Sequence, residues 1–571
     1  TISFRNPVSM LNQLNIYGPT NRTMFNPYAT WNIVKGLTYK VSFGLDNSTG
    51  TLNRSVDVKT PGFDNSTNGG KGFASIQNLN KKATTLEHTI NYVKTFGKSN
   101  LDLLGGFAYY KYENVGSGLD ANYFIASAGF PLLNNLGFVD NTGSNKAYSG
   151  GSYKNISELQ SFFGRAQYNI AEKYYLTGTL RADGSSKFGE NNKYGIFPAV
   201  NGAWRIAGED FFKKGGLVSD LKLRAGWGIT GNSEGFPANQ TINTYVPDGN
   251  GGIRKENVAN PDLKWESTVS KNVGLDWAMM SGRLSGSLDY FMKSTKDLLF
   301  ALPALQPDVA TTSWSNVDAD IRNQGLEVLV NYDVLSGKKL SWDISLNSTF
   351  MKNEVKSLAL TTVRTGAIYG QGLSGAFAQP IKVGYPLYTF FVPEFLGYDD
   401  KGLSKLGETK DFGSPFPKAL WGLTNSFVYG NWNASIFING QKGGYVLNNT
   451  ALALMGAPAI KQGNNTDSRW LDPKQSFSDG LTVSSKYVEK SDFVRLSNLV
   501  IGYNFKVKSN YINSLGLSLT GQNLFLITKY KGLDPEITNP SASMDGIPSN
   551  GIDYITYPKN KTFNLGLNVG F

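Results

Sequence analysis

Apolar and small or polar residues alternate strictly over the last nine positions of the chain. The apolar positions are Phe563, Leu565, Leu567, Val569 and Phe571, and asparagine or glycine lies between them. In a β-strand, residues of one parity share a face, so a period of two predicts a strand with one apolar and one polar face. The same alternation recurs at 221–228 and 515–520. Such strands predict an all-β, transmembrane antiparallel β-barrel, with lipid on its outer face and water on its inner face.

Turn residues and stretches rich in glycine or asparagine divide this pattern into seventeen predicted strands. Short connections, such as 35–36 and 429–431, alternate with much longer ones, such as 353–417 and 443–490. This asymmetry is typical of outer-membrane barrels, which have short periplasmic turns and long extracellular loops. The predicted strands are 24–34, 37–47, 83–95, 100–113, 157–170, 173–183, 195–207, 220–230, 264–278, 282–293, 322–334, 339–352, 418–428, 432–442, 491–505, 514–526 and 561–571.

The strand count also predicts how the chain is organised. Seventeen is an odd number, whereas bacterial single-chain barrels have an even number of strands. Counted back from a periplasmic C-terminus, strand 24–34 runs toward the periplasm, so 1–23 are expected to be the remnant of an extracellular loop. We therefore expect 24–571 to form a barrel wall with its extracellular loops, and an odd number of strands to be missing from this sequence.

Composition argues against several other classes of protein. No segment approaches the ~20 consecutive apolar residues of a membrane-spanning helix. The chain has no cysteine and a single histidine, His88, so thiolate metal sites and histidine-based catalytic triads are not available. The net charge is +11, but Lys and Arg are scattered singly and no nucleic-acid motif is present. Anionic lipid headgroups or an acidic partner are the expected counter-charges, and no enzyme activity or cofactor is expected.

Two apolar runs, 298–305 and 451–460, lie in stretches that are otherwise polar. Contiguous apolar residues in loops that face water either pack within their own loops or contact a partner. Both explanations stay open from the sequence alone. The candidate partner-contact residues are Leu298, Leu299, Phe300, Leu452, Leu454 and Met455.

Several longer phrases occur in a fixed order along the chain. They are LRADGSSKFG at 180–189, NKYGIFP at 192–198, LKLRAGWGITGN at 221–232, NPDLKWE at 260–266, TKDLLF at 295–300, NQGLE at 323–327, GYPL at 384–387, FVRLSNL at 493–499, GYN at 502–504, GQNLF at 521–525 and DPE at 534–536. Through these phrases the chain resembles the C-terminal portion of the SusC/RagA-type TonB-dependent outer-membrane transporters of the Bacteroidetes.

This resemblance implies a barrel of 22 strands closed by a plug. The plug, the N-terminal periplasmic domain and about five strands would then be absent from this sequence. The resemblance also implies import of a nutrient, an oligosaccharide or a peptide, with a SusD-type surface lipoprotein over the barrel mouth. The TonB complex would act through the missing N-terminal part, and Phe571 would be the outer-membrane assembly signal. A passive porin-like or structural barrel is the alternative, and a plug encoded upstream would distinguish the two.

Overall fold

The structure is a computed structural model, and almost all of its regular structure is β-strand. In the described part of the chain, no helix is both long enough and apolar enough to cross a membrane. The described residues are 7–57, 72–124, 131–139, 147–213, 215–249, 251–304, 310, 312–337, 339–360, 363–369, 373, 375–461, 463, 465–508, 511–537, 543–544 and 547–571.

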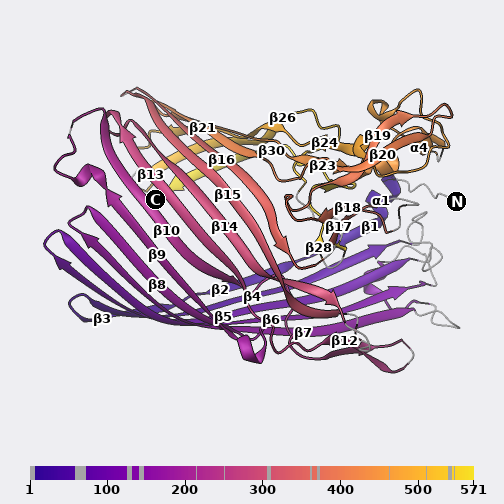
Figure 1. Ribbon diagram of the computed structural model, residues 1–571, viewed down its shortest axis with the longest axis horizontal. Helices are drawn as coiled ribbons and strands as arrows, with labels where there is room; N and C mark the ends of the chain where they lie inside the picture. Colours follow the sequence, from indigo (N-terminus) through magenta and orange to yellow (C-terminus); the bar gives the residue numbers. More distant parts are fainter. Residues whose placement is uncertain are drawn as a thin grey trace.

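One large sheet forms the wall of the molecule (Figure 1). It contains 21 strands, and seventeen of them are wall strands that each pair antiparallel with the next wall strand along the chain. The seventeen predicted strands are therefore confirmed. The wall strands are β3 (Tyr28–Val34), β4 (Leu37–Val56), β5 (Phe73–Phe96), β6 (Ser99–Asn122), β7 (Tyr148–Ile170), β8 (Tyr174–Ser185), β9 (Tyr194–Arg205), β10 (Val218–Asn232), β13 (Glu266–Met279), β14 (Leu284–Pro303), β15 (Thr312–Ser336), β16 (Leu340–Leu358), β21 (Ala419–Tyr429), β22 (Trp432–Lys442), β25 (Phe493–Phe505), β26 (Ser514–Thr528) and β30 (Thr562–Gly570).

The pairing register gives the wall two chemically different faces. One cross-strand row joins Leu223, Leu275, Leu288 and Val328, and the neighbouring row joins Ala225, Val273, Tyr290, Leu326 and Phe350. We call the side that carries these rows the apolar face. Residues of the other parity, such as Arg224 and Asp289, form the polar face. The same division continues to the last strand, where Leu567 pairs with Leu517 and Asn568 pairs with Gly516.

Several wall strands extend further than their sequence predicts. β4 ends at Val56 instead of residue 47, and β5 begins at Phe73 instead of residue 83. The extensions contain glycine, asparagine and serine, which have low β propensity, but each extension pairs with a neighbouring strand along its whole length. Long-range pairing therefore outweighs the local preference of these residues.

The same effect corrects the expectation for 1–23. β1 (Leu14–Tyr17) and β2 (Thr20–Phe25) are strands, and both pair with the extended part of β4. They lie in line with β3, which pairs with the beginning of β4. The extended β4 offers backbone groups that these segments can pair with, so residues 14–17 and 20–23 are strand and not irregular loop.

The sheet has two edges in the part of the chain that the structure describes. β30 pairs with β26, whereas β1, β2 and β3 all pair with β4. No described ladder joins β30 to β1, β2 or β3. Each of these edges therefore presents backbone N–H and C=O groups that the sheet itself does not pair.

The connections differ greatly at the two ends of the wall, which we call the short-turn end and the long-loop end (left and right in Figure 1). At the short-turn end, Gly36 between β3 and β4 has a φ of 84°, which favours glycine. The long-loop end carries most of the smaller elements. The smaller elements not yet given are α1 (Pro7–Gln13), β11 (Thr244–Pro247), β12 (Ile253–Val258), β17 (Val363–Ala367), β18 (Phe377–Ile381), β19 (Phe391–Tyr398), β20 (Ser404–Asp411), β23 (Tyr445–Asn448), α3 (Asn449–Leu454), α4 (Ala457–Lys461), β24 (Val488–Lys490), β27 (Ser543–Met544), β28 (Ile547–Pro548), β29 (Ile552–Asp553) and the 3-10 helices η1 (Leu132–Asn134), η2 (Glu190–Asn192), η3 (Ile206–Gly208), η4 (Met280–Gly282), η5 (Ser468–Trp470) and η6 (Ser485–Tyr487).

The two faces of β30 predict opposite tolerance to charge. Leu567 lies on the apolar face with 65% of its surface exposed, so Leu567→Arg is expected to destabilise folding into a bilayer by ~2–4 kcal/mol. Asn568→Lys places a similar charge on the polar face and is expected to be tolerated. Denaturant titrations of folding into phospholipid vesicles measure both effects. Equal losses for the two variants would contradict the assignment of the faces.

Candidate functional site

The polar face carries charged side chains that neutralise one another across strands. Arg224 of β10 lies 2.7 Å from Asp276 of β13 and 2.9 Å from Asp289 of β14. On β8, Arg181 contacts Asp183 at 2.7 Å and donates a hydrogen bond to Ser161 of β7 at 2.8 Å. Such groups are costly in lipid and are found where a barrel interior is wet. The polar face can therefore line an aqueous passage.

At the long-loop end, loops fold over this polar face. Ile321 of β15 and Val355 of β16 have polar-face parity, and both are buried against Val363 of β17 and Ile381 of β18. The β17–β18 hairpin thus covers the inner side of the wall near its mouth.

Two of the phrases found in the sequence meet in a joint at the rim of the wall. Phe188 and Trp265 are buried with their ring centroids 4.4 Å apart, and the Gly189 amide donates a hydrogen bond to the Leu263 carbonyl oxygen at 3.0 Å. A Cβ at Gly189 would lie 1.9 Å from the Pro261 carbonyl oxygen, so the close approach of the two segments requires glycine. This contact fixes the connection before β13 to the connection between β8 and β9.

A second joint brings together the phrases at 493–499 and 534–536. The guanidinium of Arg495 on β25 is 4% exposed and lies 2.8 Å from Asp534 and 3.0 Å from Glu536. Glu536 also contacts Lys559 at 2.5 Å, near the start of β30. The charged pair at Arg495 and Asp534 is buried, so it holds the connection between β26 and β30 to the wall.

A third joint uses amide side chains. Asn353 of β16 donates a hydrogen bond to the Asn323 side-chain oxygen of β15 at 2.7 Å. The Asn353 side-chain oxygen in turn accepts a hydrogen bond from the Leu387 amide at 2.7 Å. The phrases at 323–327 and 384–387 therefore meet at this point. In all three joints, segments that are distant in the sequence attach the long loops to the wall.

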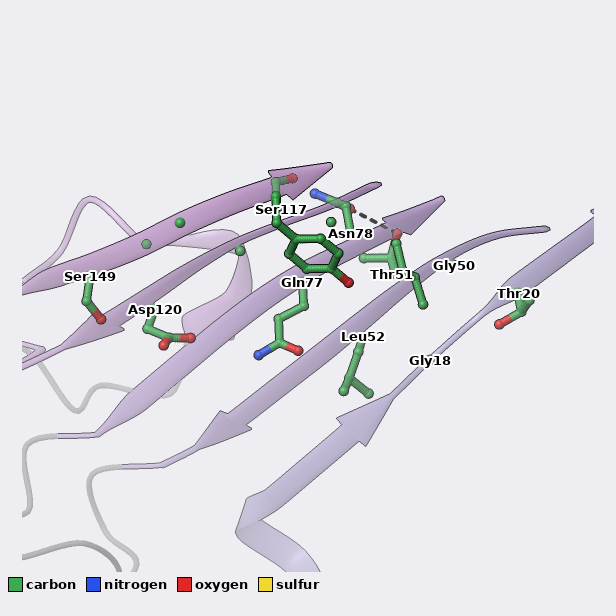
Figure 2. Close-up of a pocket in the computed structure, with 16 residues that line it drawn as sticks. Gly18, Thr20, Gly50, Thr51, Leu52, Gln77, Asn78, Ser117, Asp120 and Ser149 are labelled. Atoms are coloured by element: carbon green, nitrogen blue, oxygen red, sulfur yellow. Dashed lines mark hydrogen bonds between the residues drawn. The ribbon is translucent and has the colours of Figure 1, made fainter. Parts of the chain in front are cut away.

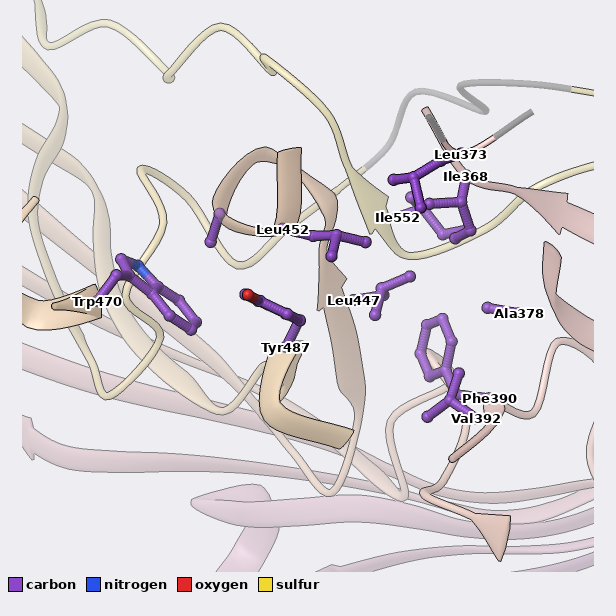
Figure 3. Close-up of a cluster of buried hydrophobic side chains, with 11 residues drawn as sticks. Ile368, Leu373, Ala378, Phe390, Val392, Leu447, Leu452, Trp470, Tyr487 and Ile552 are labelled. Atoms are coloured by element: carbon purple, nitrogen blue, oxygen red, sulfur yellow. The ribbon is translucent and has the colours of Figure 1, made fainter. Parts of the chain in front are cut away.

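The loops from β16 to β25, together with the connection to β30, share a hydrophobic core of their own, which we call the loop core (Figure 3). Trp470 and Tyr487 stack with centroids 5.5 Å apart, and Leu447 pairs with Ile552 of β29. Beside this core, Lys486 Nζ donates a hydrogen bond to the Tyr398 hydroxyl at 2.6 Å. Burial lowers the pKa of Lys486 and raises the pKa of Tyr398 to about 12. These loops therefore pack together as one unit and are not independent of one another.

The apolar run at 451–460 contributes largely to this loop core. Leu452 has no exposed surface and packs among the core side chains, so the prediction that it contacts a partner is wrong (Figure 3). The run folds inward because Asn448 caps α3 and accepts a hydrogen bond from the Ala451 amide at 2.8 Å. Leu454 and Met455 are half-buried, and Met455 packs against the core. Partner contacts by these two residues stay predictions.

The run at 298–305 lies at the end of β14, and residue 305 is outside the described residues. Leu298 and Phe300 pack against Ile321 and its buried neighbours, and Leu299 packs toward Trp265. All three line a pocket of about 380 Å³ on the inner side of the wall. They are half-buried, so their contact with a partner stays a prediction.

A polar groove of about 740 Å³ lies on the extended strands β4 to β7 (Figure 2). Thr20, Leu52, Gln77 and Asp120 project to the same side of the sheet, and they have polar-face parity. Within the described residues, the side chains of Gln77 and Asp120 form no hydrogen bond, so both are available to a ligand. The groove is not predicted from the sequence, because the glycine- and asparagine-rich segments that form it are predicted to be loops. A signal was present in the glycines Gly50, Gly116, Gly118 and Gly151, which line the groove.

Several large apolar side chains are exposed on the loop assembly. The sequence alone did not identify them as candidates for contact with a partner. Leu396 of β19 is 53% exposed, and Phe477 is 56% exposed. Leu403, in the turn after β19, lies near Phe477, because the Ser476 amide donates a hydrogen bond to the Gly402 carbonyl oxygen at 2.9 Å. We call Leu396, Leu403 and Phe477 the mouth patch.

The remaining candidates show no chemical site in the described ranges. No group of three or more His, Cys, Asp or Glu residues there could hold a metal ion. His88 lies on the apolar face, where its Nδ1 is 2.6 Å from the Tyr39 hydroxyl. Phe571 is 85% exposed at the short-turn end, and its role as an assembly signal stays a prediction.

An antiparallel wall with an apolar outer face, a charged inner face and long loops at one end defines an outer-membrane β-barrel. The chain belongs to the family described as "TonB dependent receptor-like, beta-barrel", whose model matches residues 3–524. The long-loop end is therefore the extracellular end, and the short-turn end faces the periplasm.

Comparison with individual proteins agrees with this family. TonB-dependent receptor P3 of Formosa agariphila is 29% identical over 596 residues, covering 96% of this chain and 58% of that protein. TonB-dependent receptor SusC of Bacteroides thetaiotaomicron is 28% identical, covering 84% of this chain and 49% of that protein. A structure of the RagAB peptide transporter matches with a TM-score of 0.79 and 22% identity, covering 98% of this chain and 63% of that one. The resemblance to SusC/RagA-type transporters is confirmed, and the chain spans about half to three-fifths of these relatives.

The buried ion pair at the second joint gives a stability prediction. Arg495→Ala is expected to destabilise the joint by about 3–5 kcal/mol, because Asp534 stays buried without its cation. Lys559→Ala is the matched control, since Lys559 is 37% exposed and an exposed ion pair contributes ~0–1 kcal/mol. Hydrogen exchange at 529–537 measures the effect. Equal loss of protection in both variants would show that burial of the pair is unimportant.

The loop core gives a second prediction. Leu452→Ala is expected to destabilise the loop assembly by about 2–5 kcal/mol, because it leaves a cavity among fully buried side chains. Ile460→Ala in the same run is the control and should have a small effect, since Ile460 is 41% exposed. Limited proteolysis within 443–490 reports both. Both proteins are purified without any partner. If the unaltered protein and the Leu452→Ala variant resist cleavage equally, the loop core is not a folded unit.

Proposed function

We propose that this chain is the wall and extracellular mouth of a TonB-dependent importer for an oligosaccharide or a peptide. The observation that carries the proposal is the loop assembly folded over a charged inner face, in a chain of this receptor family. In the proposed protein, the plug, the periplasmic domain and the strands that complete the barrel come from sequence outside these 571 residues. The outer edges of β3 and β30, which no described strand pairs with, support this part of the proposal.

The inner face would hold cargo through polar groups. The groove in Figure 2 offers the side chains of Gln77 and Asp120, which form no hydrogen bond among the described residues, beside a glycine-lined stretch of sheet. Tyr153 lies across Gly116 in the same groove, where a Cβ on the glycine would be 2.4 Å from its ring. An aromatic ring beside several hydrogen-bonding groups suits a cargo rich in hydroxyl or amide groups. Both oligosaccharides and peptides have this chemistry.

A SusD-type lipoprotein is the proposed lid over the mouth. The mouth patch supports this proposal, because large apolar side chains exposed on a folded loop assembly are typical of an interface. Leu454 and Met455 lie in the same loop assembly and remain candidates for this contact. The half-buried Leu298, Leu299 and Phe300 are candidates on the inner side of the mouth, facing the pocket that they line.

Energy dependence tests the import proposal. Cells that carry the intact gene should take up fluorescently labelled cargo, and uptake should stop when a protonophore dissipates the proton-motive force. Labelled oligosaccharides and labelled peptides are supplied separately, so the cargo class that enters identifies the substrate. Uptake that continues after the protonophore, and that a gene deletion abolishes, would indicate a passive porin instead.

Co-purification tests the lid. An epitope-tagged lipoprotein encoded beside this gene should co-purify with the barrel, and Phe477→Glu should reduce the recovered complex, because it places a charge in the mouth patch. Leu533→Glu is the control, since Leu533 is 68% exposed outside the mouth patch. If the tagged lipoprotein never associates with the intact barrel, the lid proposal fails, whatever the result of the uptake experiment.

A further inference from the structure

Toward the extracellular end, the side chains on the apolar face of β13 to β16 change from apolar to positively charged. Below the change, Val273, Tyr290 and Phe350 lie in one cross-strand row and are 53%, 48% and 49% exposed. Above it, the same face carries cations. These are Lys271 of β13, Lys296 of β14, Arg322 of β15, and Lys352 and Lys356 of β16, which we call the outer cationic patch.

The register places these side chains in neighbouring rows. Lys271 pairs with Met292, Met292 with Gln324, and Gln324 with Lys352, so the two lysines end one row. The next row contains Arg322, and the row beyond it contains Lys296. Successive rows on one face are two residues apart, or ~7 Å along a strand. The patch therefore begins immediately above the last apolar row.

The patch carries an excess of positive charge. Its carboxylates are Asp320 and Glu354, and the exposed Asp318 lies one row further out on β15, so five cations face three anions and the excess is two. Glu354 is shared by Lys352 at 2.8 Å and Lys356 at 2.6 Å. Lys271 and Lys296 are exposed, and neither has a carboxylate within ion-pair distance in the described part of the chain. Arg322 lies 3.8 Å from Asp320, and its Nε is buried without a hydrogen-bond partner among the described residues.

We propose that the outer cationic patch binds the phosphate groups of the phosphorylated glycolipid in the outer leaflet of the outer membrane. The lipid's acyl chains would lie on the apolar rows that contain Tyr290 and Phe350, directly below the cations. Its phosphates would then meet Lys271, Lys296 and Lys352 at the level where the wall leaves the hydrocarbon. Lysine near an anionic membrane surface contributes about 1 kcal/mol per residue. This proposal depends on the membrane location of the barrel and not on its cargo.

On another part of the same face, the positive and negative charges nearly cancel. On β5 to β7, Lys82, Lys111 and Lys154 also lie on the apolar-face side. Here Lys111 contacts Glu113 at 3.2 Å and Glu158 at 3.9 Å, and Lys82 pairs across the ladder with Glu113. Three lysines and two glutamates leave an excess of one. These lysines supply a matched control with the same number of substitutions.

The test uses the full-length protein, stripped of lipid in detergent, and purified lipid A as the probe. Native mass spectrometry measures binding of phosphorylated lipid A and of the same lipid A after its phosphates are removed. The protein should bind the phosphorylated form more tightly. The variant K271Q/K296Q/K352Q should weaken this binding by roughly fivefold for each lysine removed, and K82Q/K111Q/K154Q should change it little.

Three results would overturn the proposal. They are equal binding of the two lipid forms by the unaltered protein, equal effects of the two triple variants, and conversion of a dimer to a monomer by K271Q/K296Q/K352Q without loss of lipid. The last result would assign the patch to contact with a second copy. If the patch variant fails to fold, the comparison of the two lipid forms on the unaltered protein decides alone.

Discussion

Lipid offers no partner to a backbone N–H or C=O group, and this constraint governs the whole molecule. A wall strand can cross the membrane only if both of its edges are paired. Long antiparallel ladders join each of the seventeen wall strands to the next, and the outer edges of β3 and β30 have no partner among the described strands. The ladders fix the register, the register fixes which residues share a face, and the faces decide where charge is allowed. The ion pairs of Arg224 and the exposed apolar row at Val273 are two sides of one ladder.

The wall was predictable from the sequence because its signals are local. Alternation of apolar and polar residues and the residues of the short turns predicted all seventeen wall strands. The lengths of several strands were not predictable. β4 and β5 continue through residues of low β propensity because a neighbouring strand pairs with them, and that neighbour cannot be identified from the segment itself.

The loops were harder to predict for a related reason. An apolar run such as 451–460 has the same composition whether it meets a partner or its own chain. Leu452 is buried because Leu447 of β23 pairs with Ile552, more than a hundred residues further along the chain. The phrases that carry the family resemblance also mark where the loops are joined to the wall. Those at 493–499 and 534–536 mark the two halves of the Arg495 joint.

The wall strands differ in length, so the rim of the mouth is not level. β5 and β6 have 24 residues each, whereas β8 and β9 have 12. At ~3.3 Å per residue, the first pair reaches ~80 Å and the second ~40 Å. The wall is therefore of uneven height: β5 and β6 form its tall side, whereas β8 and β9, and also β21 and β22 with 11 residues each, are much shorter. The entrance is therefore oblique, because its rim lies ~40 Å further from the short-turn end at β5 and β6 than at β8 and β9.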